Sequence, residues 1–286
     1  MRNKKIVVLL VTFILLLVTV IPAAAITWGE PDAGEHPHVG TLLFVQNGVG
    51  YYSCTGTMIA PRVMVTAGHC VEEAGNINDV TYVRFDEDAF SGLGEYKTLN
   101  QWFNKEWLAV ETVIPHPNFD DYSQFPLTYD VGVVILKNAY YPEDADGNVI
   151  FGTLPELHFL EGLKGDEKNL FTVVGYGMQG TLPPFYQDNY KRYKGTVKLL
   201  EVDSYLTAGG AASAKFSNNP GTGGGTCYGD SGGPTFFEDG NMIVAVTSFG
   251  WAKGGNCVGN DFNYRMDIPD ALDFLYEVLD EYGGKK

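Results

Sequence analysis

The sequence predicts an all-β protein, built as a barrel or sandwich of many short strands. Three observations carry this prediction. Hydrophobic residues make up 45% of the 286 residues and charged residues only 19%, which is the composition of a folded chain. Glycine is frequent at 35 residues, and tyrosine and phenylalanine contribute 17 each, as in β-rich folds with many turns. Short apolar runs alternate with turn residues, and few helical patterns lie between them.

The predicted strands are runs of Val, Ile, Thr or aromatic residues bounded by Gly, Pro, Asn or Asp. In chain order they are Thr41–Val45, Thr57–Ile59, Val63–Thr66, Val80–Phe85, Val131–Leu136, Phe171–Val174, Thr196–Leu200 and Met242–Ser248. Turn residues near 140–155 divide the chain into similar halves. One C-terminal helix is expected, because Pro269 suits a first helical turn and apolar residues recur at helical spacing from Ala271 to Leu279. Gly283-Gly284 should end it.

The first 25 residues have the pattern of a secretory signal peptide. A basic start precedes an apolar run over residues 6–21, and Pro22 and the alanines at 23–25 follow as a cleavage site. An uncleaved membrane anchor is the alternative, but the run is shorter than the about 20 residues that a span needs. We therefore expect an exported protein whose mature chain begins at Ile26.

The charge balance excludes two classes of partner. The formal net charge is −16, and removal of the three bases in residues 1–25 takes it to −19. A nucleic-acid binder needs a basic face, and so does a protein that docks on anionic lipid. Four cysteines in an exported chain indicate disulfides, and counting alone allows three pairings. The sequence contains no C-x-x-C pair, so nothing supports a structural zinc site.

The sharpest feature of the sequence is Gly229-Asp230-Ser231-Gly232-Gly233-Pro234. Glycines around a serine leave room for a substrate backbone and permit unusual dihedrals that aim N–H groups into a small pocket. The string also satisfies G-x-S-x-G, the nucleophile elbow of α/β-hydrolases. That fold places its histidine after the serine, and the last histidine here is His158, so chain order excludes it.

A nucleophilic serine needs a neighbouring base, and His69 is the candidate. It follows the apolar strand Val63–Thr66 and precedes Cys70, where a cross-link would hold it in place. Asp130 is the matching acid, because it leads into Val131–Leu136, a run apolar enough to be buried on both faces. A carboxylate at that place is costly unless it has a partner.

The order His69, Asp130, Ser231 closely resembles that of the chymotrypsin/trypsin family of serine peptidases. The resemblance extends over essentially Ile26–Leu279, and chance agreement of all its motifs is negligible. The matching blocks are Cys54–Ile59, Thr66–Cys70, Tyr129–Leu136, Val174–Gly177, Gly229–Pro234 and Ser248–Gly250.

The resemblance implies a peptidase domain over residues 26–286, made of two antiparallel β-barrels of the chymotrypsin-like type with the C-terminal helix outside. Residues 26–145 would form the barrel with the histidine and aspartate, and residues 146–286 the barrel with the serine. It also implies the disulfides Cys54–Cys70 and Cys227–Cys257.

The implied activity is that of a secreted serine endopeptidase. Ser231 would attack the scissile carbonyl, His69 would take its proton, and Asp130 would orient His69. The backbone N–H groups of Gly229 and Ser231 would hold the oxyanion. An inactive homologue that binds partners is the competing interpretation, although such proteins usually lose one of these residues. An esterase on the same scaffold is a third.

In this family a free α-amino group pairs with the aspartate before the catalytic serine, which is Asp230 here. Ile26 lies 43 residues before His69 and directly follows the alanines at 23–25, so signal peptidase itself would create the active N-terminus. Asp230 would otherwise be a buried, unpaired carboxylate. A zymogen cut at a later site is the alternative.

The resemblance places the floor of the specificity pocket at Gly225 and Thr226, and its wall at Ser248, Phe249 and Gly250. An open, uncharged pocket favours large apolar or aromatic side chains before the cleaved bond. The loop over residues 257–264 is ambiguous. One register puts Asp261 on the pocket wall, which would favour Arg or Lys, and another puts Phe262 there.

No cofactor is expected, and the predicted partners are protein or peptide substrates of a monomeric enzyme. A metal site could be drawn from His36 and His38 with Asp32 and Glu35, but two histidines at i, i+2 across a proline are thin evidence for one. A weaker hypothesis is calcium in the loops after His69, where some family members bind it through acidic side chains. The acidic residues concerned are Glu72, Glu73, Asp79, Asp86, Glu87 and Asp88.

Overall fold

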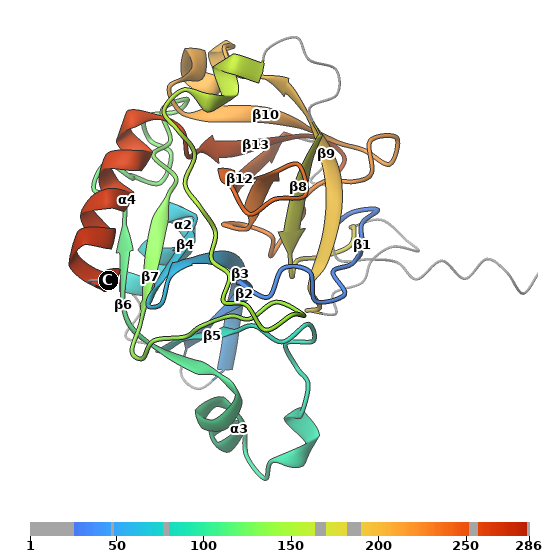
Figure 1. Cartoon of the computed structure of the whole chain (residues 1–286), viewed down its shortest axis with the longest axis vertical. Helices are drawn as coiled ribbons and strands as arrows, with labels where there is room; N and C mark the ends of the chain where they lie inside the picture. The colour runs from blue at the N-terminus through green and yellow to red at the C-terminus, as the bar shows by residue number, and fades with distance from the viewer. Residues whose placement is uncertain are drawn as a thin grey trace, which may run out of the picture.

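The computed structural model describes residues 26–46, 49–76, 80–163, 170–181, 190–251 and 257–284. The expected signal peptide therefore lies outside the described residues. Two barrels stand one above the other in Figure 1, with helix α4 along one side and α3 projecting at the far end of the first barrel. Within the described ranges, no helix combines the length and the apolar character needed to cross a bilayer.

The first barrel is closed by six antiparallel strands in the order β2-β3-β4-β7-β6-β5. Their bounds are β2 Val39–Gln46, β3 Val49–Ala60, β4 Val63–Thr66, β5 Val80–Arg84, β6 Leu108–Pro115 and β7 Gly132–Leu136. Helix α2 (Gly68–Asn76) follows β4 directly. The segment between β5 and β6 carries the 3-10 turn Leu93–Glu95 and helix α3 (Leu99–Glu106). Its aromatic side chains pack together, as Trp102 stacks on Phe90 at 5.6 Å.

The second barrel is closed by β8-β9-β10-β13-β12-β11, and β11 pairs back to β8. The bounds are β8 Leu170–Gly175, β9 Tyr193–Glu201, β10 Ser213–Asn218, β11 Pro234–Phe237, β12 Ile243–Trp251 and β13 Gly259–Arg265. Two further 3-10 turns are Phe159–Leu163 and Tyr205–Gly210. The predicted fold class, two antiparallel β-barrels with a C-terminal helix, is confirmed.

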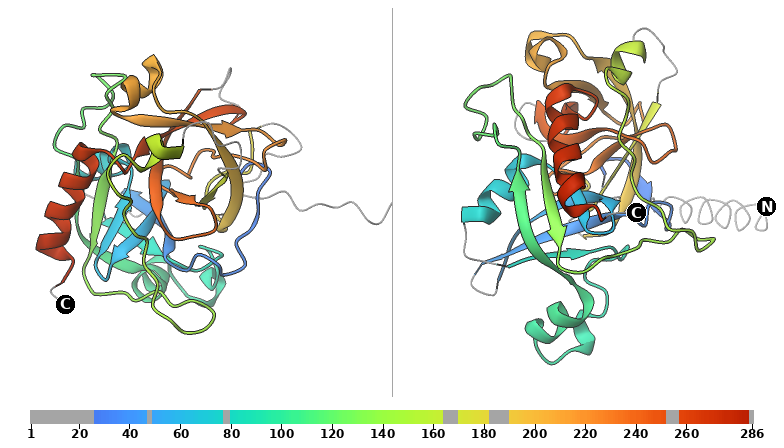
Figure 2. Two further views of the ribbon diagram at one scale, coloured as in Figure 1. Left: turned by 45° about the horizontal axis from the view of Figure 1, so that its top comes forward. Right: turned by 60° about the vertical axis from the view of Figure 1, so that its left-hand side comes forward.

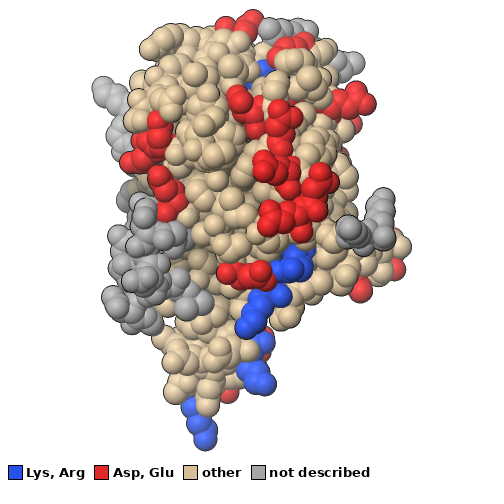
Figure 3. Space-filling view, turned by 90° about the vertical axis from the view of Figure 1, so that its left-hand side faces the viewer, with Lys and Arg blue, Asp and Glu red and all other residues tan. Residues whose placement is uncertain are grey.

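Helix α4 (Pro269–Tyr282) covers the seam between the barrels. Pro269 stands in its first turn and Gly283 caps its end, as predicted. Its Leu275 shares one core with Val133 of β7 and Phe236 of β11, so a single apolar cluster joins both barrels. The outer face of α4 is acidic and contributes to the acidic surface in Figure 3. Its exposed acids are Asp270, Asp273, Glu277, Asp280 and Glu281.

The N-terminal segment belongs to the second barrel by its contacts. Strand β1 (Glu30–Pro31) pairs with β9, and Thr27 forms a bridge with Gly225. The sequence grouped these residues with the first barrel because they precede it in the chain. The packing of Ile26 places the start of this segment in the second barrel, since Ile26 is fully buried in the core of that barrel.

Candidate active site

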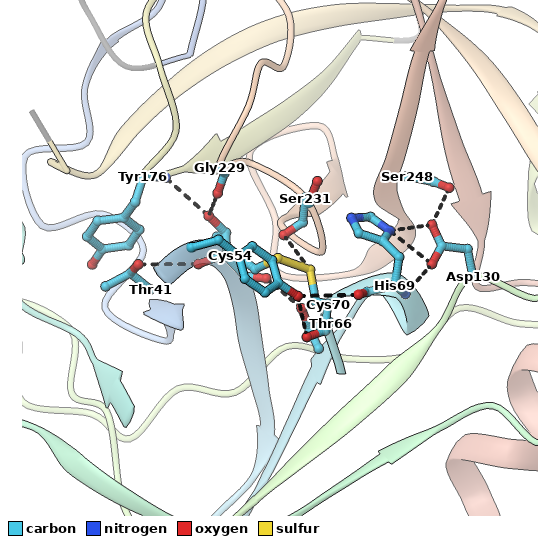
Figure 4. Close-up of a disulfide and its surroundings, with 12 residues drawn as sticks. Thr41, Cys54, Thr66, His69, Cys70, Asp130, Tyr176, Gly229, Ser231 and Ser248 are labelled. Carbon is cyan, nitrogen blue, oxygen red and sulfur yellow. Dashed lines mark hydrogen bonds and ion pairs between the residues drawn. A yellow bond between two sulfur atoms is a disulfide. The ribbon is translucent and has the colours of Figure 1, made fainter. Parts of the chain in front are cut away.

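His69 and Asp130 meet because β4 and β7 are neighbours in the first barrel. His69 lies at the start of α2, and Asp130 lies just before β7. Nδ1 of His69 is 3.0 Å from Oδ2 and 3.1 Å from Oδ1 of Asp130. The backbone N–H of His69 also donates to Oδ1, at 2.9 Å. In Figure 4 the imidazole lies between Asp130 on one side and Ser231 on the other.

The Asp130 carboxylate is fully buried and well supplied with donors. Burial alone would raise its pKa, but the charge of His69 and hydrogen bonds from His69 and Ser248 hold the pKa of Asp130 below its usual value. The carboxylate therefore stays ionised and accepts the Nδ1–H of His69. That tautomer makes Nε2 the basic nitrogen of the neutral ring.

The Ser231 loop of the second barrel is anchored to the first barrel. The backbone N–H of Thr55 donates to the carbonyl of Ser231 at 2.8 Å. Gly232 has a φ of +77°, and a Cβ there would lie 2.0 Å from Oγ1 of Thr66, so only glycine fits. Ser231 and His69 line the same cavity.

Two backbone N–H groups at this loop are available to an anion. Gly229 has a φ of +95°, and its carbonyl is turned toward the first barrel, where it accepts from Oγ1 of Thr55 at 2.9 Å. Within the described ranges, no group accepts a hydrogen bond from the N–H of Gly229 or of Ser231. Unpaired N–H groups are rare in folded proteins, and a pair of them suits a developing oxyanion.

A cavity of about 410 Å³ opens beside Ser231. Five residues expected at the pocket line it, and seven others besides His69 and Ser231 do so as well. The expected ones are Thr226, Ser248, Phe249, Gly250 and Asp261. The others are Asn218, Cys227, Tyr228, Thr247, Cys257, Val258 and Asn260.

Gly225 does not line this cavity, which differs from the expectation that it forms the pocket floor. The side chain of Asn218, from β10, lies over it, and a Cβ on Gly225 would come within 2.1 Å of that side chain. Asn218 thus takes the place assigned to the glycine. No sequence spacing indicates this, because β10 meets the loop only through the barrel.

Asp261 lies on the cavity wall, and only 3% of the residue is exposed. Asn218 donates to Oδ1 at 2.7 Å, and the N–H and hydroxyl of Thr226 donate to Oδ2 at 2.7 and 2.8 Å. Burial raises the pKa of Asp261 to about 6, against the lowering effect of these bonds. Phe262 instead stacks on Phe249 at 5.0 Å and does not line the cavity.

The disulfides have the pairing that the resemblance implied. Cys54–Cys70 joins β3 to α2 next to His69, and Cys227–Cys257 forms part of the cavity wall. The Cys54–Cys70 bond and its hydrogen-bonded surroundings are drawn in Figure 4.

The segment that begins at Ile26 approaches the serine loop. Thr27 exchanges backbone hydrogen bonds with Gly225 at 3.0 and 3.2 Å. The carboxylate of Asp230, five residues further on, is fully buried and accepts from the N–H groups of Gly177 and Cys227 at 2.8 and 2.9 Å. The pairing of an Ile26 amino group with Asp230 stays a proposal.

The acidic loop after β5, where calcium is one hypothesis, is organised around Arg84. The guanidinium of Arg84 already occupies its centre, where it donates to Asp86 at 2.6 Å and to the carbonyls of Ala89 and Ser91 at 3.2 and 3.0 Å. Carboxylate and carbonyl oxygens are also the ligands that calcium prefers, so calcium binding near this loop stays a hypothesis. Asp79 and the side chain of Glu73 lie outside the described residues.

A second buried polar cluster joins the N-terminal segment to the barrels. Asp32 accepts from the Arg192 guanidinium at 2.8 Å and lies 2.5 Å from Nδ1 of His36. His38 is 1% exposed, and neither ring nitrogen has a hydrogen-bond partner among the described residues. Burial, helped by the charges of His36 and Arg192, lowers the pKa of His38 to about 3.

Two six-stranded barrels with His69, Asp130 and Ser231 at their junction define the chymotrypsin-like class of folds. The sequence model "Trypsin" matches residues 26–267, and this chain belongs to that family. It is 28% identical to the CLIP domain-containing serine protease B15 of Anopheles gambiae over 77% of this chain and 60% of that one. It is 26% identical to the phenoloxidase-activating enzyme of Bombyx mori, over 79% of this chain and 52% of that one. The chain thus spans little more than half the length of these relatives.

Solved structures support the same fold. HL collagenase aligns with a TM-score of 0.61 at 19% identity, over 91% of this chain and 100% of that one. Neuropsin, a serine protease of mouse brain, aligns with a TM-score of 0.61 at 18% identity, over 88% and 98%.

Proposed function

We propose that this chain is a secreted serine endopeptidase that hydrolyses peptide bonds through an acyl-enzyme on Ser231. The observation that carries the proposal is the hydrogen-bonded pair of His69 and Asp130, because His69 and Ser231 line the same cavity. The signal-peptide pattern and the two disulfides support secretion. Its substrates are proteins or peptides, and it works as a monomer.

In the acylation step, Oγ of Ser231 bonds to the scissile carbonyl carbon while Nε2 of His69 takes the hydroxyl proton. The oxygen of the tetrahedral intermediate accepts from the N–H groups of Gly229 and Ser231. The C–N bond then breaks, and His69 passes its proton to the leaving amine. Water repeats the sequence on the ester, which frees the acid product and restores Ser231. Asp130 stays ionised and stabilises the imidazolium throughout.

Activation follows from the N-terminal segment. The α-amino group of Ile26, once the leader is removed, pairs with the carboxylate of Asp230 and fixes the loop that carries Gly229 and Ser231. Support comes from the burial of both residues and from the bridge between Thr27 and Gly225.

The pocket accepts a large side chain before the cleaved bond. Its volume of about 410 Å³ and the aromatic ring of Phe249 suit aromatic and long apolar side chains. Gly250 keeps the entrance open, because it places no side chain there.

Asp261 gives the pocket a second preference, for an Arg or Lys side chain before the cleaved bond. Its carboxylate lies on the cavity wall, and no lysine or arginine in the part of the chain that the structure describes pairs with it. A carboxylate offers about four acceptor sites, and three are occupied, so Oδ1 keeps one. A Cβ on Gly250 would lie 3.7 Å from that oxygen, so the glycine leaves it accessible. A buried charge without a counter-charge favours a cationic side chain from the substrate.

A peptide library in which every residue is varied tests the proposal. We expect cleavage after large side chains, with Arg and Lys joining Phe and Tyr at about pH 8, where Asp261 is ionised. His69→Ala should abolish it while leaving the thermal unfolding midpoint nearly unchanged, since the His69 ring is partly exposed. A wild-type protein that cleaves no sequence, with both disulfides formed, would favour the inactive binding homologue instead.

A further inference from the structure

The hydroxyl of Tyr122 reaches the His69–Asp130 pair from the loop before β7. It donates to Oδ2 of Asp130 at 2.8 Å, and its oxygen lies 3.1 Å from Nδ1 of His69. Nothing in the sequence marks Tyr122 as part of the site, because it stands in an irregular segment eight residues before Asp130.

Two hydroxyl groups thus hold the same carboxylate oxygen. Ser248, from β12 of the second barrel, also donates to Oδ2 of Asp130. Tyr122 approaches from the first barrel, so the Asp130 carboxylate accepts hydrogen bonds from both barrels. With Nδ1 of His69 also 3.0 Å away, the acceptor sites of Oδ2 are filled. The rotation of the carboxylate about its own bond is therefore fixed.

The backbone around Tyr122 is shaped to deliver this hydroxyl. Asp121 and Tyr122 have φ values of +54° and +63°, in the left-handed region that such residues rarely adopt. Strained residues of this kind cluster where a geometry is needed for function. The ring is held edge-on to Phe119 at 5.7 Å and to Phe249 at 6.1 Å.

The ring also covers the pair on its open side. Tyr122 borders a second hollow of about 370 Å³, which is shared with His69 and flanked by Tyr52 and Glu72. Asp130 itself is fully buried, so the ring stands between the carboxylate and this hollow. Removing water from around a charged hydrogen bond strengthens it.

We propose that Tyr122 is a positioning residue for catalysis, whose hydroxyl holds Asp130 in the orientation that faces Nδ1 of His69. This inference rests on the proposed function, since it assigns the His69–Asp130 pair to proton transfer. Tyr122 touches neither the attacking oxygen nor the scissile bond and acts through Asp130. Burial and the charge of Asp130 raise the pKa of Tyr122, so the phenol remains a donor over the whole working pH range.

Tyr122→Phe removes the hydroxyl and keeps the ring. We expect kcat to fall about tenfold for an Arg and a Phe substrate alike, with KM changed less than about twofold, because one hydrogen bond to a charged group is lost. The unfolding midpoint should fall by about 3 to 6 °C, which leaves the variant folded at the assay temperature. Tyr129→Phe is the matched control. Its ring stacks on His116 at 5.2 Å, and the variant should keep the wild-type kcat.

Two further readouts separate this inference from the proposed function. An organophosphonate that labels Ser231 should do so about tenfold more slowly in Tyr122→Phe. Equal labelling of both proteins would overturn the role of Tyr122 and leave the peptidase intact. If the wild type itself takes no label, the proposed function fails.

In that case the downfield NMR signal of the Nδ1 proton of His69 still tests whether Tyr122 positions the His69–Asp130 pair. A shift in Tyr122→Phe but not in Tyr129→Phe supports the positioning role, and an unchanged signal overturns it.

Discussion

Asp261 should make the cleavage preference depend on pH. Its pKa of about 6 means that the carboxylate is almost fully ionised at about pH 8 and only about one-eleventh ionised at about pH 5. An Arg or Lys side chain needs the ionised form, whereas a Phe side chain does not. The ratio of kcat/KM for Arg over Phe substrates should therefore fall about tenfold between these pH values.

The assay mixes two fluorogenic peptides that differ only in Arg or Phe before the cleaved bond. Both are cleaved by one enzyme in one tube, so protonation of His69 lowers both rates by the same factor and cancels in the ratio. Asp261→Asn should lose at least about tenfold in the Arg over Phe ratio at pH 8, because a hydrogen bond between charged groups is removed.

The same variant should also give a ratio that no longer changes with pH. Asp280→Asn, which removes an exposed charge on the outer face of α4, is the control and should behave as wild type. A wild-type ratio that stays flat from pH 8 to 5 would refute the reasoning, because Asp261 would then not contact the substrate.

Three other results are expected. His38 is buried neutral, so its folded pKa of about 3 lies below its unfolded value of 6.5. The free energy of unfolding therefore decreases as pH falls through 6.5 toward 3, by about 2.5 kcal/mol between pH 7 and 4.5. In urea unfolding, His38→Leu should lose about 2.5 kcal/mol less than the wild type over the same pH range. Arg84→Met should lower the free energy of unfolding by about 2 kcal/mol. EDTA should leave the unfolding midpoint of the wild type unchanged, and a large effect of EDTA would instead support calcium binding. Asp130→Asn should lower kcat about 10⁴-fold, the size seen when a His-orienting aspartate of this kind becomes asparagine, and burst kinetics with an active ester would measure it.

The sequence predicted β4 and α4 well, because both have apolar patterns with clear boundaries. It missed β13, whose residues Asp261, Asn263 and Arg265 read as a polar loop. These side chains are buried all the same, since Asn263 bonds to Thr235 at 2.7 Å and Arg265 to Asp267 at 2.8 Å. Internal pairing of this kind hides a strand from any pattern of hydrophobicity.

The active site shows the same difference between residues that a local sequence pattern predicts and residues that it does not. Local motifs predict Ser231, His69 and Asp130, and the two barrels bring these residues together. Tyr122 and Asn218 could not be predicted, because each acts through a contact between distant loops or strands. For Asn218 that contact is with Gly225 and Asp261, which belong to other parts of the second barrel.

The most direct test of the central claim is the intact mass of the secreted protein, with and without an organophosphonate serine probe. We expect a chain that begins at Ile26 and gains one adduct, and we expect no adduct in Ser231→Ala. Both disulfides should persist in the labelled protein. An adduct only on a chain that begins later would contradict activation by signal peptidase, and the absence of any adduct would contradict the assignment of Ser231 as an activated nucleophile.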